Sequence, residues 1–162
     1  GRTFIEPSQN IRSLGVKLKL SPTKSIVKNK SVILINDSLV RGTTCFKIVK
    51  MLYEAGAKEV HVRIACPEIK FPDFYGVDMP TKGELLAHQK SLLEMQNYIK
   101  AKSLKFLSLK GLYQALEKGE RNDAYPQFSD HYFTGDYPIK PVDKLGESKV
   151  TQLSLLSGKS NN

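Results

Sequence analysis

The sequence predicts an α/β fold with a mainly parallel sheet flanked by helices, and two observations carry that prediction. A short, largely apolar run at residues 31–35 precedes a helical apolar pattern at 43–55, and a strand pattern follows at 60–64. A strand, a helix and a strand in this order form a βαβ unit, whose strands are parallel and whose crossover is right-handed. The 162 residues are 40% hydrophobic and 25% charged, which is a globular composition that suits one domain.

Residues 15–36 form the first predicted element and are interpreted as extended. Apolar residues alternate with lysines at 16–20, which is the period-two pattern of a half-exposed strand. The short group at 25–27 is assigned to the same extended region. Residues 32–35 are apolar without interruption, and such a run predicts a strand buried on both faces, as in a parallel sheet.

A helix is predicted next. Its apolar residues recur at helical spacing, at Cys45, Phe46, Ile48, Val49, Leu52 and Tyr53. Thr43 or Thr44 is the expected N-cap, because a threonine hydroxyl can accept a hydrogen bond from the first turn. Gly56 stands where a helix commonly ends in a left-handed glycine. The strand at 60–64 then completes the βαβ unit.

The sequence from residue 66 to residue 94 predicts a long loop and two further helix starts. Residues 66–80 contain prolines, glycines and aromatics and are expected to form a loop, with packing beneath it as the expected role of its aromatic rings. Thr81 with Glu84, and Ser91 with Glu94, both match the capping box, which opens a helix.

The last predicted elements are a strand at 104–107 and a helix at 109–116 closed by Gly119. Beyond residue 120 the chain is polar and weakly periodic, which predicts an irregular C-terminal tail. The expected division is therefore a main domain, an extension of it and a disordered tail, at residues 1–120, 121–145 and 146–162.

Charge is distributed unevenly along the chain. Residues 1–50 hold ten basic and two acidic residues, so they carry +8 of the total net charge of +9. This predicts an anionic partner for that part, with a solvated lysine-rich face as the alternative. No run is long and apolar enough for a membrane span, and no signal peptide is recognisable. The two cysteines, Cys45 and Cys66, fit a reducing cytosol, so a cytoplasmic protein is expected.

A polar run at the end of the apolar strand is the candidate binding site, because open α/β sheets bind ligands beyond the carboxyl ends of their strands. Asp37 offers two acceptor oxygens to vicinal hydroxyls or to a metal-bound water. Gly42 allows the backbone to approach a phosphate, and Thr43 and Thr44 add hydroxyl donors at a helix N-terminus. Any two of these residues would suit an ordinary strand-to-helix turn, but the whole run favours a sugar phosphate.

The run at 32–44 closely resembles the phosphoribosyl pyrophosphate signature of type I phosphoribosyltransferases. Further segments narrow the resemblance to the amidophosphoribosyltransferase family, at residues 1–7, 54–60, 67–72, 75–80 and 133–138. The resemblance covers residues 1–140 and implies a partial type I phosphoribosyltransferase fold. The family forms 5-phosphoribosylamine from phosphoribosyl pyrophosphate and glutamine, the first step of de novo purine synthesis.

The resemblance also implies which residues bind the substrate. The contacts within the signature are Asn36, Asp37, Ser38, Val40, Arg41, Gly42, Thr43 and Thr44, and Mg²⁺ is expected at Asn36 and Asp37. Arg2 is implied as catalytic because it lies in the matched segment 1–7. Lys19 is implied as a contact to the pyrophosphate, since charge-assisted bonds stabilise a leaving group of high negative charge. The alternative for Lys19 is the wet face of a strand.

The chain departs from the family in what it lacks. Nothing here corresponds to the glutaminase domain with its N-terminal cysteine, or to the first strands of the transferase domain. The chain is therefore expected to be the C-terminal third of such an enzyme, inactive alone. Its expected partners are the missing segments, or further copies if it is full length; neither nucleic acid nor membrane is expected. The family usually has an acid where Asn36 stands, so a non-catalytic phosphoribosyl pyrophosphate or nucleotide-binding module and a decayed gene remnant are the alternatives.

Many members of the family bind an iron–sulfur cluster through four cysteines. Three of those positions correspond here to Asp73, Ser129 and Tyr132, none of which is a thiolate, so no cluster is expected. The histidines, His61, His88 and His131, have no carboxylate or cysteine at ligand spacing in the sequence. Each is expected to be a surface or packed side chain rather than a ligand or a base.

Overall fold

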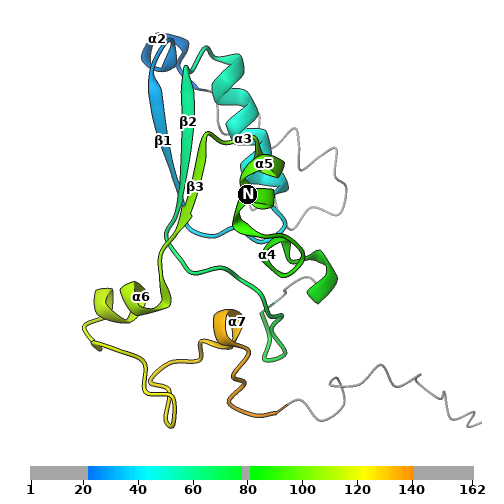
Figure 1. Cartoon of the computed structure of the whole chain (residues 1–162), viewed down its shortest axis with the longest axis vertical. Helices are drawn as coiled ribbons and strands as arrows, with labels where there is room; N and C mark the ends of the chain where they lie inside the picture. The colour runs from blue at the N-terminus through cyan, green and yellow to red at the C-terminus, as the bar shows by residue number, and fades with distance from the viewer. Residues whose placement is uncertain (1–21, 78–80, 141–162) are drawn as a thin grey trace, which may run out of the picture.

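The computed structural model describes residues 22–77 and 81–140. Its centre is a parallel three-stranded sheet of β1 (Ser31–Asn36), β2 (Glu59–Ile64) and β3 (Ser103–Phe106), in that order (Figure 1). α3 (Thr43–Glu54) connects β1 to β2, so the predicted parallel βαβ unit is confirmed. The predicted strand at 16–20, Arg2, Lys19 and the tail at 146–162 lie outside the described residues.

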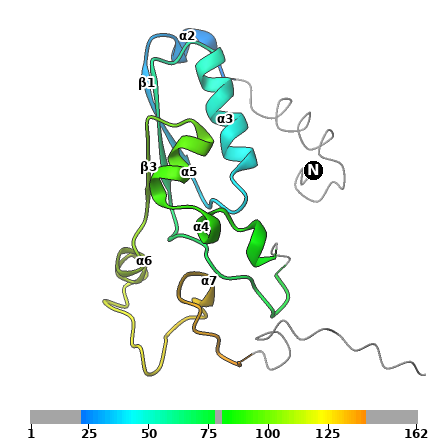
Figure 2. The ribbon, with the colours of Figure 1, turned by 45° about the vertical axis from the view of Figure 1, so that its right-hand side comes forward.

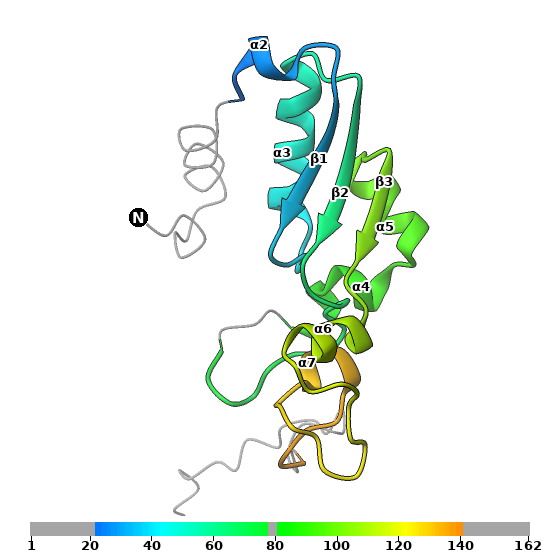
Figure 3. The same cartoon turned by 90° about the vertical axis from the view of Figure 1, so that its left-hand side faces the viewer.

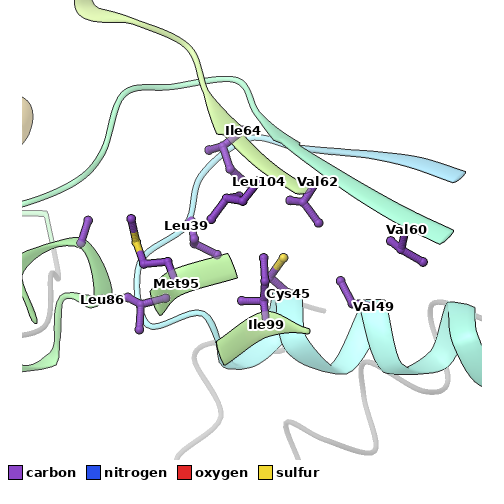
Figure 4. Packing of buried hydrophobic residues seen from close by; sticks show 11 residues of the cluster. Leu39, Cys45, Val49, Val60, Val62, Ile64, Leu86, Met95, Ile99 and Leu104 are labelled. Atoms are coloured by element: carbon purple, nitrogen blue, oxygen red, sulfur yellow. The ribbon is translucent and has the colours of Figure 1, made fainter. Parts of the chain in front are cut away.

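One face of the sheet is covered by helices. α3 and α5 (Leu92–Ile99) pack against it, as the edge-on view shows (Figure 2). The side chains of β2 alternate, so that Val60, Val62 and Ile64 point toward the helices and are buried (Figure 4). The core cluster also contains Leu39, Cys45, Val49, Leu86, Ala87, Met95, Ile99 and Leu104. Burial of this apolar surface is the main term that holds the layers together.

Within residues 22–77 and 81–140 no helix or strand covers the other face of the sheet, and this corrects the expectation that residues 31–35 form a strand buried on both faces. β1 is an edge strand of the sheet that the described residues form, and Ile33 and Ile35 are 65% and 73% exposed. Figure 3 shows this face toward the viewer, with α3 and α5 behind the sheet. On β2 the open face carries polar side chains, because His61 lies opposite Ile33 and Arg63 lies opposite Ile35. The described helices therefore flank one face of the sheet only.

Residues 25–27 were predicted to be extended, but they lie in the short helix α2 (Lys24–Val27). Two helical hydrogen bonds form here. The N–H groups of Val27 and Lys28 donate to the carbonyl oxygens of Thr23 and Lys24 at 3.2 and 2.9 Å. Asn29 then takes a left-handed conformation with φ of 61° and turns the chain into β1. Three apolar or small residues are too few to set a period, so the local turn decides the structure.

The start of α3 also differs from the expectation. Gly42 is the N-cap residue, with φ of 76°, and neither Thr43 nor Thr44 caps the helix with its side chain. Thr43 is instead the first helical residue. At the other end Gly56 has φ of 96°, which confirms it as the glycine that follows the helix.

The two capping boxes are confirmed, but only one opens a long helix. Ser91 and Glu94 begin α5, where the Ser91 N–H donates to Glu94 at 2.8 Å. Thr81 and Glu84 begin a single 3₁₀ turn, Lys82–Glu84, which is followed by the four-residue helix α4 (Leu86–Gln89).

The remaining helices are α6 (Leu109–Ala115) and α7 (His131–Thr134). Glu117 turns the chain after α6, with φ of 57°, before the predicted terminator Gly119 is reached. No periodic pattern predicted α7, because this helix has only four residues. Within the described residues, no helix has the length and apolar character that crossing a membrane requires.

Candidate binding site for a sugar phosphate

The loop between β1 and α3 lies at the carboxyl end of the sheet, where the predicted signature falls (Figure 1). Its first turn is held by its own side chains. The Asn36 amide donates from Nδ2 to the Ser38 carbonyl at 3.0 Å, and the Ser38 N–H donates to Asp37 Oδ1 at 2.7 Å. Leu39 is 2% exposed and anchors the loop in the core. These contacts leave Asp37 Oδ2 and the Asn36 amide oxygen without a partner among the described residues.

The N-terminus of α3 completes the loop. The first helical bond runs from the Phe46 N–H to the Gly42 carbonyl at 2.9 Å. The N–H groups of Thr43 and Thr44 precede that bond and have no acceptor in the described part of the chain. Free N–H groups and the helix dipole favour an anion at this position.

Gly42 is required by both conformation and space. Its φ of 76° is a left-handed value that residues with a side chain rarely adopt. A Cβ atom at Gly42 would lie 2.7 Å from Leu86 Cδ2 and 3.0 Å from Tyr98 Cε1. The signature loop therefore packs directly against α4 and α5, a contact that the sequence alone did not indicate.

A second set of contacts joins the loop to residues 84–86. Arg41 donates from Nε to Glu84 Oε1 at 3.0 Å, and the Leu86 N–H donates to the Val40 carbonyl at 2.9 Å. The hydrogen bond from Arg41, together with those from Thr81, holds the pKa of the Glu84 carboxyl below its usual value. Residues 36–44 thus form one loop, and Glu84 lies beside it through Arg41, a contact that sequence reasoning missed.

The oxygen atoms at the end of β1 are of the kind that Mg²⁺ binds. Within the described ranges, no three His, Cys, Asp or Glu side chains gather as a complete metal site. Mg²⁺ in phosphate-binding sites is commonly held by one or two carboxylates, with phosphate oxygens and water as the other ligands. Asp37 supplies one such carboxylate, and Asn36 supplies a neutral amide oxygen beside it.

Burial disfavours the thiolate form of both cysteines. Burial raises the pKa of the Cys45 thiol to about 11. Burial, with a smaller contribution from the negative charge of Asp37, raises the pKa of the Cys66 thiol to about 11. A hydrogen bond from the Leu39 N–H lowers this pKa but does not outweigh the other two effects. Both thiols are therefore protonated near neutral pH. This agrees with the interpretation of Cys45 as a core residue.

The three positions that the resemblance matches to cluster ligands, Asp73, Ser129 and Tyr132, lie together around His131. Its Nε2 is 2.8 Å from Asp73 Oδ1, and its Nδ1 is 3.0 Å from Ser129 Oγ. The ring of Tyr132 lies with its centroid 4.0 Å from that of His131. His131 is packed, as expected, but its carboxylate partner is 58 residues away, so no local spacing could reveal it.

Asp73 is ionised in this cluster. Burial disfavours its charge, but hydrogen bonds from the Val77 N–H, from His131 and from the Tyr75 N–H outweigh burial. The pKa of the Asp73 carboxyl therefore lies below its usual value.

Comparison with known proteins identifies relatives over most of the chain, although no protein-family model matches it. An amidophosphoribosyltransferase of Rhizobium etli is 57% identical over 158 residues, which are 97% of this chain and 32% of that protein. The chloroplastic amidophosphoribosyltransferase 2 of Arabidopsis thaliana is 51% identical over 88% of this chain and 25% of its own length.

The fold gives the same relationship. The structure of the glutamine phosphoribosylpyrophosphate amidotransferase of B. subtilis, complexed with ADP and GMP, matches 86% of this chain with a TM-score of 0.70 and 46% identity. The match covers 30% of that protein, so the chain spans about a third or less of the length of these relatives. The chain is therefore homologous to the C-terminal phosphoribosyltransferase part of the amidophosphoribosyltransferases, and its parallel sheet with flanking helices is a partial type I phosphoribosyltransferase fold.

Proposed function

We propose that this chain is the phosphoribosyl pyrophosphate-binding part of an amidophosphoribosyltransferase, which forms 5-phosphoribosylamine from phosphoribosyl pyrophosphate and glutamine. The observation that carries the proposal is the loop at 36–44. It joins a carboxylate, an arginine and a helix N-terminus with free N–H groups at the carboxyl end of a parallel sheet. The names of the relatives support the same reaction.

Each part of the loop has a distinct role in this proposal. Asp37 holds the ribose side of the substrate, directly or through the metal, with the oxygen that the turn leaves free. The N–H groups and hydroxyls of Thr43 and Thr44 hold the 5′-phosphate, and Gly42 lets the backbone approach it. Ser38 and Val40 contribute through the turn that they form. Arg2 and Lys19, which lie outside the described residues, are proposed as contacts to the pyrophosphate that departs.

Mg²⁺ is the proposed metal, held by Asp37 and by the amide oxygen of Asn36 together with the substrate. When bound, it would neutralise negative charge on the pyrophosphate. Asp37 is the only acidic residue at 31–44, so it is proposed as the main protein ligand.

The remaining parts of such an enzyme are the proposed partners. The open edge of β1 and the exposed Ile33 and Ile35 support this, because an uncovered apolar edge strand readily pairs with another strand. A cytoplasmic location is proposed with this function.

We expect the chain alone to make no phosphoribosylamine from ammonia or glutamine, and turnover by the isolated chain would contradict this.

A binding experiment tests the proposal. Asp37→Asn is expected to weaken binding of phosphoribosyl pyrophosphate in Mg²⁺ by about 10- to 100-fold, the range for a lost charged hydrogen bond. Asn36→Ala is expected to weaken it much less, since the amide carries no charge. The measurement is calorimetric titration of the chain, alone and combined with the rest of the enzyme. Equal losses in the two variants would reject the role of Asp37.

A non-catalytic binding module is the second candidate, and Asn36 favours it because an amide brings no charge to Mg²⁺. Phosphoribosyl pyrophosphate binding without phosphoribosylamine formation by the complete assembly would select this candidate. Asn36→Asp separates the explanations further. It is expected to strengthen Mg²⁺-dependent binding if Asn36 replaces a lost acid, and unchanged or weaker binding would make the amide an accepted variant.

A further inference from the structure

The arginine of the signature loop is held by a residue more than forty positions away. Arg41 contacts Glu84 through Nε at 3.0 Å, and both side chains are 48% exposed. Its terminal nitrogens, Nη1 and Nη2, have no acceptor among the described residues. A guanidinium offers five N–H donors in one plane, so a contact through Nε leaves the two terminal nitrogens available for a second anion.

Glu84 is itself fixed in place by its own turn. Its Oε2 accepts from the Thr81 N–H at 3.2 Å and from Thr81 Oγ1 at 3.1 Å, while Oε1 accepts from Arg41. The two carboxylate oxygens therefore have separate tasks: one closes the capping box and the other holds the arginine.

The backbone of the signature loop and the backbone at residues 84–86 are also fixed relative to each other. The Leu86 N–H donates to the Val40 carbonyl at 2.9 Å, and Leu86 packs against Gly42. Val40 is one residue from Arg41 and Leu86 is two residues from Glu84, so this bond holds the two backbones close together. Less conformational entropy therefore remains to be lost when the two side chains pair. An arginine that is ordered before its ligand arrives loses less freedom on binding.

We propose that Glu84 is a positioning residue for phosphate binding, which holds Arg41 by Nε so that Nη1 and Nη2 are presented to an anionic oxygen of the sugar phosphate. This inference rests on the proposed function of the loop. In this proposal the 3₁₀ turn Lys82–Glu84 supports the binding site through Arg41 and does not contact the ligand itself. Lysine at position 41 would make both contacts through one nitrogen, so it could not be held by one nitrogen while it presents two others to the anion.

The chain contains a matched control for Glu84. Glu94 closes the same kind of capping box, with Ser91 N–H at 2.8 Å and Ser91 Oγ at 2.7 Å. Its pKa is lowered by those bonds, but no arginine lies within salt-bridge distance of it in the described ranges. Glu94→Gln therefore perturbs a capping box alone, whereas Glu84→Gln perturbs a capping box and the contact to Arg41.

The test is calorimetric titration of phosphoribosyl pyrophosphate in Mg²⁺ into the wild type, Glu84→Gln and Glu94→Gln, each alone and combined with the rest of the enzyme. Glu84→Gln is expected to raise the Kd about two- to five-fold, the effect of losing one exposed ion pair. Glu94→Gln is expected to leave it unchanged. In an Arg41→Lys background, Glu84→Gln is expected to have no further effect, because the two residues act through one contact.

The outcomes separate this inference from the proposed function. Absence of phosphoribosyl pyrophosphate binding by the wild type in both forms would overturn the proposed function and the inference with it. Binding by the wild type with equal Kd values for Glu84→Gln and Glu94→Gln would overturn the inference alone. A full, additive effect of Glu84→Gln in the Arg41→Lys background would also overturn it, since a purely structural role of Glu84 does not depend on the guanidinium.

Discussion

The strand that bears the signature and the segment at 121–140 are stabilised in opposite ways. β1 has regular hydrogen bonds along one edge, yet its apolar residues Ile33 and Ile35 are exposed. The segment at 121–140, called the C-terminal segment below, contains one short helix, yet Asp130 and His131 are 4% and 1% exposed. Irregular backbone must satisfy its polar groups through side chains, whereas a strand satisfies them through its neighbour. Regular structure and burial are thus separate properties in this molecule.

Arg121 is the centre of the C-terminal segment. It contacts Asp130 through Nε at 2.7 Å, Asp136 through Nη2 at 2.6 Å and Asp123 through Nη1 at 2.6 Å. Tyr113 donates to the same Asp130 carboxylate at 2.8 Å, which connects the segment to α6.

The largest effect is expected from Arg121→Leu, which leaves the buried Asp130 without its cation. The free energy of unfolding should fall by about 3 kcal/mol or more, as for other buried pairs that lose one partner. Urea denaturation measures the change. Lys110→Leu is the control, because Lys110 pairs with Glu120 on the surface and its loss should matter by less than about 1 kcal/mol. Similar losses in both variants would show that Asp130 is not held as described.

Gly42→Ala is expected to have the next largest effect, in the signature loop rather than in the C-terminal segment. It combines a left-handed φ with a Cβ contact of 2.7 Å to Leu86, whereas Gly119 has φ of 69° and nothing within 4 Å. Gly42→Ala should therefore lower the free energy of unfolding by about 1–3 kcal/mol more than Gly119→Ala, the usual effect of overpacking. Thermal denaturation of the two variants measures the difference, and equal losses would contradict the packing against α4 and α5.

Acid should weaken the C-terminal segment through Asp73 and Asp130. Burial raises the pKa of Asp130, but hydrogen bonds from Arg121 and Tyr113 outweigh it and hold that pKa below its usual value, as at Asp73. A carboxylate with a lower pKa in the folded state stabilises the fold above its unfolded pKa of about 4. That contribution is lost as the pH falls from about 4 toward the lower folded value.

Urea denaturation between pH 6 and pH 3 measures this loss, with wild type compared to Asp73→Asn. The variant is expected to be less stable at pH 6 and to depend less on pH below about 4. An equally steep pH dependence in the variant would exclude Asp73 as a source of it.

The smallest effect on stability is expected from Ile33→Thr on the open face of β1. Because Ile33 is 65% exposed, the free energy of unfolding should change by less than about 0.5 kcal/mol. Val62→Thr is the matched change on the covered face, where Val62 is fully buried, and it should destabilise by about 1–3 kcal/mol. A large loss of stability in Ile33→Thr would mean that the open face is covered.

The sequence predicted the regular elements well because their signals are local. Apolar alternation located β2 at 59–64 and the helical stripe located α3, each within about one residue. The same patterns could not decide whether β1 was covered, because hydrophobicity shows what a strand would bury and not which neighbours it has. The group at 25–27 was too short for its period to be read, and it is a helical turn.

The candidate site was predictable only in its contiguous part. Asn36 to Thr44 follow one another in the chain, so resemblance to a known signature could identify them together. Glu84 contacts Arg41, and Asp73 contacts His131, across 43 and 58 residues. A single sequence contains no signal for such pairs, because the turns that bring them together are set by packing.

The edge position of β1 has a consequence for how ligand and partner segments act on each other. The signature loop begins at the residue where β1 ends, so a segment that pairs with this edge and a sugar phosphate that binds the loop would order one continuous stretch of backbone. Two binding events that share the ordering of one stretch are coupled in thermodynamic terms. By linkage, the factor by which the sugar phosphate tightens assembly of the sheet equals the factor by which assembly tightens binding of the sugar phosphate.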